Sequence, residues 1–532
     1  MKDYFPAFIS LLFFTGTSFA QTTKIFAETE KAIKYTETIT QADLKKHLTI
    51  VASAEMEGRE TGTEGQRKAA AYIESQFKEI GLQYPESLKG YQQHYPLFKD
   101  TLIPKSLKIG SNKLVYGKDY ILLPGSSTEN EFKANQIVFA GYGIQDKNYD
   151  DYAGKEVKGK IVVIISGEPK VNGKFVVSGT ERPSRWGYST TMKAAVAKEK
   201  GAVAVLLINP AWDSISTALA ESSRRTNVYF PHANEKEKVT VVTLIPSQLK
   251  NIFGENEAAK ILETAKLRGL LNTTILNKNI KAKLNYKKIS IQSGASNVIG
   301  YVEGTDKKDE YVFLTAHYDH LGKRGNVIYY GADDDGSGTV SVIEMAEAFA
   351  KAKAEGHGPR RTVVFMTVSG EEKGLWGSEY YSEHPVFPLE KTTVDLNTDM
   401  VGRIDPGRNY GDSMNYVYVI GDDKLSSDLK PISIAANDKY TKLELDYKFN
   451  DPNDPERIYF RSDHYNFARK GVPIIFYFDG IHKDYHKPSD TVDKINFDLM
   501  EKRVRFIFLT AWEMANRDEM LKRDIPLPTE VR

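Results

Sequence analysis

Four apolar, strand-like runs in the second half of this chain each lead directly into acidic or histidine residues. The runs are EYVFLTA before His317, TVVFMTVSG before Glu371 and Glu372, TVDLNTD ending on Asp399, and VPIIFYFDG before HKDYHKPSD. Continuous apolar runs are typical of strands that are covered on both faces of a sheet. Open α/β sheets bind ligands beyond the carboxyl ends of their strands. The pattern therefore predicts one polar site that is assembled from several distant segments.

The stretch from His317 to Gly338 is the centre of this pattern. It joins the histidines of AHYDHLG to the three aspartates of GADDDGSG. Apolar residues then recur at helical spacing, at Val342, Met345, Ala346 and Phe349. A helix therefore begins near Gly338, and the acidic cluster lies in the loop between a strand and that helix.

Strands and helices alternate from Ala295 up to a final helix around Val504 to Met514. This alternation predicts an α/β fold with a mostly parallel sheet that carries helices on both faces. Residues 41–81 are predicted to be helical, interrupted by the loop EMEGRETGTEGQ, which is a candidate for the wall of a cleft. The second of these helices is expected to end at Gly81, a C-cap glycine.

Between about Leu107 and Lys281 the sequence pattern changes to short β-like runs. They are NQIVFAGYGI, GKIVVIISG, GAVAVLLINP and VTVVTLIPS, with one helical run, TMKAAVAKEKGA, among them. None of these runs ends in a cluster of metal-type ligands. We interpret residues 107–281 as a noncatalytic domain inserted between an N-terminal part, residues 21–106, and a core, residues 282–532.

The first 20 residues have the pattern of a secretory signal peptide. Lys2 precedes an apolar core around Phe8 to Phe14, and the small-x-small triplet SFA precedes Gln21. The run is too short for a membrane span, and no other run approaches spanning length. The chain has no cysteine, which excludes disulfides, thiol catalysis and a lipid-modified cysteine. We expect an exported, periplasmic or secreted protein without a membrane span.

Charge composition gives no sign of a polyanionic partner. The chain has 72 basic and 71 acidic residues, and so it is almost neutral. A neutral balance predicts neither nucleic acid nor an anionic membrane as a partner. The sequence does not indicate an oligomeric state.

The acidic and histidine residues fit a pair of metal ions. A catalytic zinc binds about three histidine or carboxylate ligands and keeps one position open, and two adjacent ions can share a carboxylate. The available set is His317, one or more of Asp333 to Asp335, Glu371 or Glu372, Asp399 and His486. One glutamate is left over as a general base for an attacking water. Asp319 is expected to accept a hydrogen bond from the His317 imidazole. Cobalt or manganese would suit the same ligands.

Five motifs together resemble the di-zinc aminopeptidase family that also includes glutamate carboxypeptidase II. They are AHYDH, GADDDGSG, SGEEKGLWGS, NTDMVGR and DYHKPSDT, in the order and with the spacing of the family. The resemblance implies the zinc exopeptidase fold, a mostly parallel mixed sheet sandwiched by helices. It also implies that the inserted β-rich segment is a protease-associated domain with a lid or substrate-restricting role.

The resemblance further implies two Zn²⁺ per chain and peptide substrates. In the implied ligand set, His317 and Asp399 bind one zinc, Glu372 and His486 bind the other, and Asp334 bridges the two. Glu371 is the implied general acid/base, which takes a proton from a metal-bridging water, leaves a hydroxide that attacks, and passes the proton to the leaving amine. Tyr485 matches a tyrosine that hydrogen-bonds the tetrahedral intermediate in some members.

Aminopeptidase action is the first expectation from this resemblance. A carboxypeptidase or dipeptidase of the glutamate carboxypeptidase type is the nearest alternative, since the sequence does not show which end of a peptide is recognised. A noncatalytic binding protein of the same fold and a one-zinc glutaminyl cyclase are further alternatives, both disfavoured by the complete ligand set. His320, His464 and His482 stay outside the predicted set, and Arg403 and Arg461 are undecided between substrate contacts and structural ion pairs.

Overall fold

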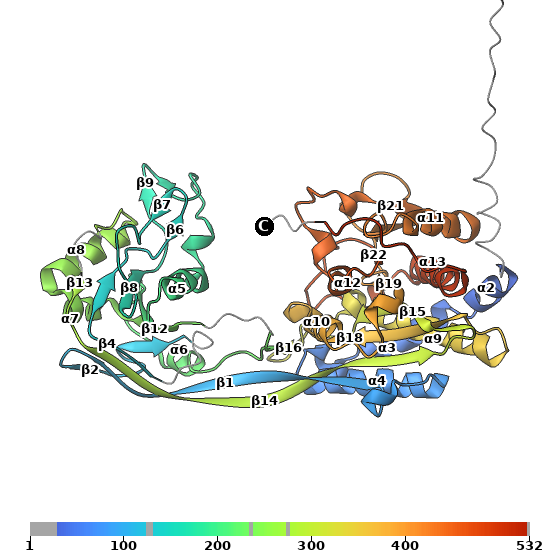
Figure 1. Cartoon of the computed structure of the whole chain (residues 1–532), viewed down its shortest axis with the longest axis horizontal. Coiled ribbons are helices and arrows are strands. Elements are labelled where there is room, and N and C mark those ends of the chain that lie inside the picture. The colour runs from blue at the N-terminus through green and yellow to red at the C-terminus, as the bar shows by residue number, and fades with distance from the viewer. Residues whose placement is uncertain (1–28, 124–130, 233–237, 273–276, 529–532) are drawn as a thin grey trace, which may run out of the picture. The chain divides into compact units, whose positions relative to one another are not determined.

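The computed structural model describes residues 29–123, 131–232, 238–272 and 277–528 (Figure 1). The predicted signal peptide lies outside the described residues. The chain divides into two compact units, of which unit 1 comprises residues 1–95 and 294–532 and unit 2 comprises residues 96–293. Within the described ranges no helix is both long and apolar enough to cross a membrane.

Unit 1 is built on a mixed sheet with four parallel strands at its centre. In spatial order these are β18 (Arg361–Val368), β15 (Lys307–His317), β19 (Thr392–Thr398) and β22 (Ile474–Phe478). The flanking strands are β14 (Ala282–Val302), antiparallel to β18, then β20 (Tyr416–Ile420), antiparallel to β22, and β21 (Glu444–Asp446) beside β20. All four apolar runs predicted as strands are confirmed, and their carboxyl ends share one edge.

The connections around β15 create a crevice at that edge. From β15 the chain passes through α9 (Gly338–Ala354) to β18 on one side, and then through α10 (Trp376–Glu383) to β19 on the other side. Such a reversal of direction is a topological switch point, where loops diverge and ligands bind. The helix predicted to begin near Gly338 is confirmed as α9.

Helices cover both faces of the unit 1 sheet, as the alternation predicted. One face packs on α9, on α13 (Phe497–Asn516), and on α3 (Gln41–Val51) and α4 (Glu64–Ile80), with α2 (Thr29–Thr36) and α11 (Leu429–Tyr440) beside α13. The opposite face packs on α10 and α12 (His464–Ala468) through an aromatic cluster. Neighbouring residues of β15 alternate between the two cores, Val312 and Leu314 in one and Phe313 in the other. The predicted C-cap is confirmed, since Gly81 has a left-handed φ of 84°.

Unit 2 contains a second sheet, in the order β13-β5-β8-β11-β12-β3. Its strands are β13 (Asn277–Lys278), β5 (Ile137–Phe139), β8 (Ile161–Ile165), β11 (Ala204–Ile208), β12 (Thr240–Leu244) and β3 (Tyr120–Leu122). The helix α5 (Thr190–Glu199) packs on one face, and α7 (Leu249–Phe253) and α8 (Glu255–Lys266) pack on the other. The four predicted β-like runs correspond to β5, β8, β11 and β12, which are parallel to one another.

A further layer of unit 2 is formed by β2 (Asn112–Leu114), β1 (Gln92–Ile109), β14 and β4 (Glu131–Ala134) as neighbouring strands. Their inward residues, Leu107, Leu114, Phe132 and Leu284, join the same core as α7 and α8. The predicted insertion, residues 107–281, falls within unit 2, and its exact boundaries stay a prediction.

Candidate metal centre

The predicted ligand side chains lie close together at the carboxyl ends of the unit 1 strands. His317 is the last residue of β15, and Asp399 directly follows β19. Glu371 and Glu372 lie in a short helical turn after β18. The remaining two come from loops, Asp334 from the segment before α9 and His486 from the segment after β22.

Asp334 lies between two histidines that come from different loops. Its Oδ1 is 3.4 Å from His317 Nε2, and its Oδ2 is 3.2 Å from His486 Nε2. Asp399 Oδ1 lies 3.5 Å from His317 Nε2, and Glu372 Oε2 lies 3.2 Å from His486 Nε2. The side chains therefore form two donor groups of one histidine and one carboxylate each, and Asp334 is common to both.

The electrostatics of this cluster favour positive charge. Burial opposes protonation of His486, but its contacts with Asp334 and Glu372 raise the pKa of the imidazole to about 10. The pKa of His317 is also raised well above its ordinary value, against burial, by Asp399 and Glu371. Histidines that hold protons this firmly mark a site with excess negative charge, which divalent cations would neutralise.

The hydrogen-bonding state of the donors also fits metal ions. Asp334 Oδ2 and Glu372 Oε1 are buried, and each faces the ring nitrogen of a histidine, His486 at 3.2 Å and His320 at 2.8 Å. His317 Nδ1 lies 3.1 Å from the Asp319 carbonyl oxygen, which can only accept, so the neutral imidazole carries its proton on Nδ1. Nε2 then presents its lone pair to the cluster, the form that a metal ligand requires.

Two further residues, His320 and Asp335, lie beside the cluster, and they differ in the hydrogen bonds that they make. His320 Nδ1 is 2.8 Å from Glu372 Oε1; His320 is buried, and the side chain of Glu372 is 4% exposed. Asp335 is also close to His317, but its oxygens accept the backbone N–H groups of Gly338, Met400 and His317 at 2.8, 3.0 and 3.2 Å. Asp335 therefore anchors backbone, whereas His320 belongs to the donor cluster. The three-residue spacing of AHYDH was the signal for His320.

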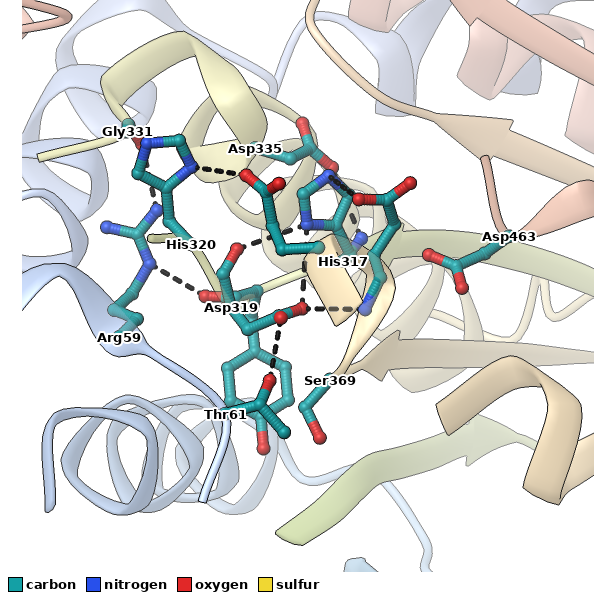
Figure 2. Close-up of polar contacts among 12 residues, drawn as sticks. Arg59, Thr61, His317, Asp319, His320, Gly331, Asp335, Ser369 and Asp463 are labelled. Atoms are coloured by element: carbon teal, nitrogen blue, oxygen red, sulfur yellow. Dashed lines mark hydrogen bonds and ion pairs between the residues drawn. The ribbon is translucent and has the colours of Figure 1, made fainter. Parts of the chain in front are cut away.

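Asp319 holds the glutamate turn in place. Its Oδ1 accepts the backbone N–H of Glu371 at 3.2 Å, and its Oδ2 accepts the Thr61 hydroxyl at 2.6 Å (Figure 2). The carboxylate is 3.7 Å from His317 Nδ1, farther than the Asp319 carbonyl oxygen. The main-chain carbonyl oxygen of Asp319, and not its carboxylate, thus makes the hydrogen bond to the His317 imidazole. The carboxylate of Asp319 orients Glu371 instead.

Arg59, in the loop before α4, supports the site from behind. It is completely buried and donates to the carbonyl oxygens of Tyr318, Tyr330, Gly331 and Val51 at 2.7 to 2.9 Å. Figure 2 shows Arg59 beside Gly331. One guanidinium thereby connects the segment after His317 to the segment before Asp334. The sequence predicts this loop as a cleft wall and gives no sign of the supporting role of Arg59 and Thr61, because their contacts with Tyr318 and Asp319 span more than 250 positions.

A pocket with both apolar and polar walls opens beside the donor cluster. Its lining consists of Met400, Ile458, Phe476, Phe478, Ile481, Arg461 and Tyr485, together with Asp334, Glu371 and Asp399. The Tyr485 ring stacks on His486 with ring centroids 3.8 Å apart. Arg461 Nη2 donates to the Tyr485 hydroxyl oxygen at 3.1 Å, so both polar groups line the same space.

The remaining candidates have structural partners. His464 is buried, with Nε2 2.8 Å from the Tyr459 carbonyl oxygen, and it stacks on Phe476. His482 Nε2 is 3.2 Å from Asp333, which lies behind the donor cluster. Arg403 donates to Asp484 at 2.9 Å. Of the two undecided arginines, Arg403 is thus an ion-pair partner and Arg461 lines the pocket.

Two family models match parts of this chain. Residues 297–511 match the model of Peptidase family M28, and residues 132–241 match that of the PA domain. A probable leucine aminopeptidase of Trichophyton verrucosum is 28% identical over 216 residues, 39% of this chain and 55% of the relative. A glutamate carboxypeptidase 2 homologue of Caenorhabditis briggsae is 32% identical over 159 residues, 30% of this chain and 18% of the relative. The chain thus spans about half of the curated aminopeptidases that it matches.

One solved structure resembles the chain over most of its length. The aminopeptidase from Aneurinibacillus sp. strain AM-1 covers 93% of this chain and 99% of its own, with a TM-score of 0.51 and 20% sequence identity. This likeness shows the fold, a mixed α/β sheet covered by helices with an inserted PA domain, and confirms the fold class predicted from the sequence.

Proposed function

We propose that this chain, whose residues 297–511 are a Peptidase family M28 region, is a di-zinc aminopeptidase that removes apolar N-terminal residues from peptides. The observation that carries this proposal is the position of Asp334 between His317 and His486, with Glu371 and a partly apolar pocket directly beside it. A shared carboxylate between two histidine–carboxylate groups is the arrangement that a pair of ions requires.

The donor groups define two metal positions. We assign His317 and Asp399 to one zinc, His486 and Glu372 to the other, and Asp334 to both. His320, which contacts Glu372, either orients that glutamate or adds to its group. Zinc bound there supplies Lewis-acid chemistry to a scissile carbonyl and to an attacking water, and cobalt or manganese would suit the same ligands.

Glu371 is the proposed general acid/base. Its backbone is held by Asp319, and its side chain lines the pocket next to Asp334 and Asp399. Burial raises the pKa of Glu371 well above its ordinary value, an effect that Glu372 and Asp399 strengthen and His317 opposes. A carboxylate with a raised pKa accepts a proton from water and returns it to a leaving amine more readily than an exposed one.

Tyr485 is the proposed hydrogen-bond donor to the oxygen that develops negative charge at the scissile carbon. Burial raises the pKa of its phenol well above the ordinary value, so the hydroxyl stays protonated. Because Arg461 donates to the phenol oxygen, the phenol hydrogen remains available to a substrate atom in the pocket.

The pocket indicates the side chain of the residue that is removed. Half of its lining residues are Ile, Met or Phe, whose side chains bind an apolar side chain by excluding water. The carboxylates of Asp334, Glu371 and Asp399 line the same pocket and offer hydrogen-bond acceptors to a free ammonium group. Both features fit a peptide with a free amino terminus and a residue such as leucine in first position.

Arg461 supports a second candidate. A guanidinium that lines the pocket is a suitable partner for a peptide carboxylate, which a carboxypeptidase or dipeptidase would bind there. Under the first proposal Arg461 instead orients Tyr485.

The deciding experiment combines metal analysis with one peptide series. Elemental analysis of the purified full chain is expected to give about two zinc ions per chain. Hydrolysis of the unblocked peptides should be lost on amino-terminal acetylation and kept on carboxyl-terminal amidation. Loss on amidation alone would establish the carboxypeptidase, and a chain without metal or turnover would contradict both proposals.

Export and the role of the insertion belong to the same proposal. We assign residues 1–20 to a secretory signal peptide and residues 107–281 to a protease-associated domain that restricts substrate size. Deletion of residues 107–281 is expected to change the preference for peptide length and to leave metal binding intact. An unchanged preference across peptide lengths would remove that role.

A further inference from the structure

The two units carry opposite net charge, although the whole chain is almost neutral. Unit 2, residues 96–293, contains 30 lysines and arginines and 18 aspartates and glutamates, a net charge of +12. The rest of the chain contains 42 basic and 53 acidic residues, a net charge of −11. Near neutrality of the sequence therefore conceals a strongly basic unit, and the expectation that no anionic surface is a partner has to be reconsidered for that unit.

Part of the basic charge of unit 2 forms a row on one sheet face, which we call the lysine face. Lys108 of β1 lies directly opposite Lys113 of β2, and Lys283 of β14 lies directly opposite Lys133 of β4. Since the residues next to them in sequence, Leu107, Leu114, Phe132 and Leu284, all point into the core, the four lysines point outward together. The lysine face thus runs across four neighbouring strands, β2, β1, β14 and β4 (Figure 1).

The strand β14 extends this face. Its outward positions after Lys283 are Asn285, Lys287, Ile289 and Ile291, because Leu284 and Tyr286 are buried between them. Ile289 is 37% exposed and Ile291 is 59% exposed. Two uncovered isoleucines therefore continue the row of lysines on a single strand.

Such an arrangement costs stability when nothing covers it. Like charges directly opposite each other on a sheet repel, and two such pairs occur here side by side. Among the described residues, one carboxylate pairs with the lysine face, Glu131, whose Oε1 is 3.2 Å from Lys283 Nζ. Lys108, Lys113 and Lys133 are exposed, and an anionic partner would relieve the repulsion between them.

The composition of the face distinguishes among anionic partners. Recognition of single-stranded nucleic acid relies on aromatic stacking and on arginine, and the outward positions named above contain neither. Lysine ammonium groups with exposed aliphatic side chains match a lipid headgroup layer, where lysines pair with phosphates and aliphatic side chains enter the acyl boundary.

We propose that the lysine face of unit 2 docks on an anionic phospholipid surface. Lys108, Lys113, Lys133 and Lys283 bind headgroup phosphates, and Ile289 and Ile291 contact the acyl boundary. Each lysine near such a surface increases affinity about fivefold, so four of them give measurable, salt-sensitive binding without a membrane span. The inference does not depend on the proposed peptidase activity.

The test measures binding of the full chain to vesicles by co-sedimentation at low salt. Vesicles of phosphatidylcholine with phosphatidylglycerol are expected to retain the protein, and vesicles of phosphatidylcholine alone are not. The triple variant Lys108→Gln, Lys113→Gln, Lys283→Gln should bind about 100-fold more weakly. Raising the salt concentration to about 0.5 M should release the unmodified chain, because screening shortens the range of these contacts.

The matched control changes the same net charge elsewhere in unit 2. Lys147, Lys174 and Lys266 are exposed and lie outside the face, and their triple change to Gln should lower binding less than about threefold. Equal weakening of both triple variants would overturn the proposal, because total charge alone would then account for binding. Retention on an acidic polypeptide without binding to phosphatidylglycerol vesicles would overturn it as well. Equal thermal unfolding midpoints of the two variants establish that both are folded.

Discussion

The carboxylate of Asp490 accepts the backbone N–H of Asp334 at 3.2 Å. The same oxygen accepts the N–H of Asp333 at 3.0 Å, and both residues are 156 or more positions away in sequence. Asp490 follows His486 by four residues, so its side chain connects the loop of one proposed ligand to the backbone of the shared one. Asp490 is therefore a positioning residue, which acts on the metal centre through the main chain of Asp334.

Replacing Asp490 is expected to weaken metal binding. Asp490→Ala leaves two buried N–H groups without an acceptor and releases the Asp334 segment, so affinity for zinc should fall about 10- to 100-fold. Asp490→Asn keeps one acceptor oxygen and should retain most of the affinity. The measurement is zinc retained per chain against a competing chelator. Asp493→Ala, at an exposed residue nearby, is the matched control, and an equal loss in that variant would contradict the positioning role.

Substitutions of Glu371 and Asp334 should have different effects on turnover and on metal content. Glu371→Ala removes the proposed proton acceptor and should lower kcat at least about 100-fold while both zinc ions remain bound. Asp334→Ala removes the shared ligand and should lose metal as well as turnover. Zinc per chain and kcat are measured on the same preparations. If Glu371→Ala loses metal and Glu372→Ala retains it, the roles of the two glutamates are exchanged.

The pocket beside Glu371 should set the preference for the first residue of the substrate. Ile481→Trp adds volume to a wall of the pocket. It is expected to lower kcat/KM for a peptide that begins with leucine about tenfold or more, and to change it little for one that begins with alanine. Ile50→Trp, at an exposed position on α3, provides the control for the added ring. Equal losses for both peptides would argue against the pocket as the binding place of that side chain.

Asp395 should make stability depend on pH. It is completely buried on β19, its Oδ1 accepts the Thr315 hydroxyl at 2.7 Å, and burial raises its pKa to about 8. The unfolded chain has the ordinary value of about 3.9. Between these two values the folded protein keeps a proton that the unfolded chain releases, so the free energy of unfolding decreases as pH rises from about 4 to about 8.

The side chain introduced by Asp395→Asn is neutral in the folded and the unfolded state. The variant should therefore remove part of the decrease in the free energy of unfolding, on the order of a few kcal/mol between about pH 4 and 8. Denaturant unfolding at several pH values between 5 and 8, with a chelator present throughout, measures the slope. Glu344 and Glu513, whose pKa values burial also raises to about 8, leave a residual slope. Asp306→Asn is the control, because the Arg360 hydrogen bond lowers the pKa of Asp306 to about 2 and the residue does not titrate in this range. Parallel slopes for Asp395→Asn and the unmodified chain would rule out this role of Asp395.

Periodicity and strand-end chemistry determined the architecture of unit 1 before any coordinates. An apolar run such as TVVFMTVSG is buried only when both faces of its sheet are covered. Parallel strands then bring their carboxyl ends to one edge of the sheet, whatever the conformation of the loops. His317, Glu371, Glu372 and Asp399 were therefore expected together, and the structure places them so. The glycine at position 81 and the helix after Gly338 followed from local rules of the same kind.

Tertiary structure alone decided which neighbouring side chains point into the site. Sequence cannot say that Asp334 faces two histidines while Asp335 turns to backbone amides, because that choice depends on the fold of the loop before α9. Arg59, Thr61 and Asp490 meet partners 156 to 272 positions away, and no local pattern encodes such a contact. The lysine face could not be predicted for a related reason. The net charge of the whole chain is a sum in which the positive charge of unit 2 and the negative charge of the rest cancel.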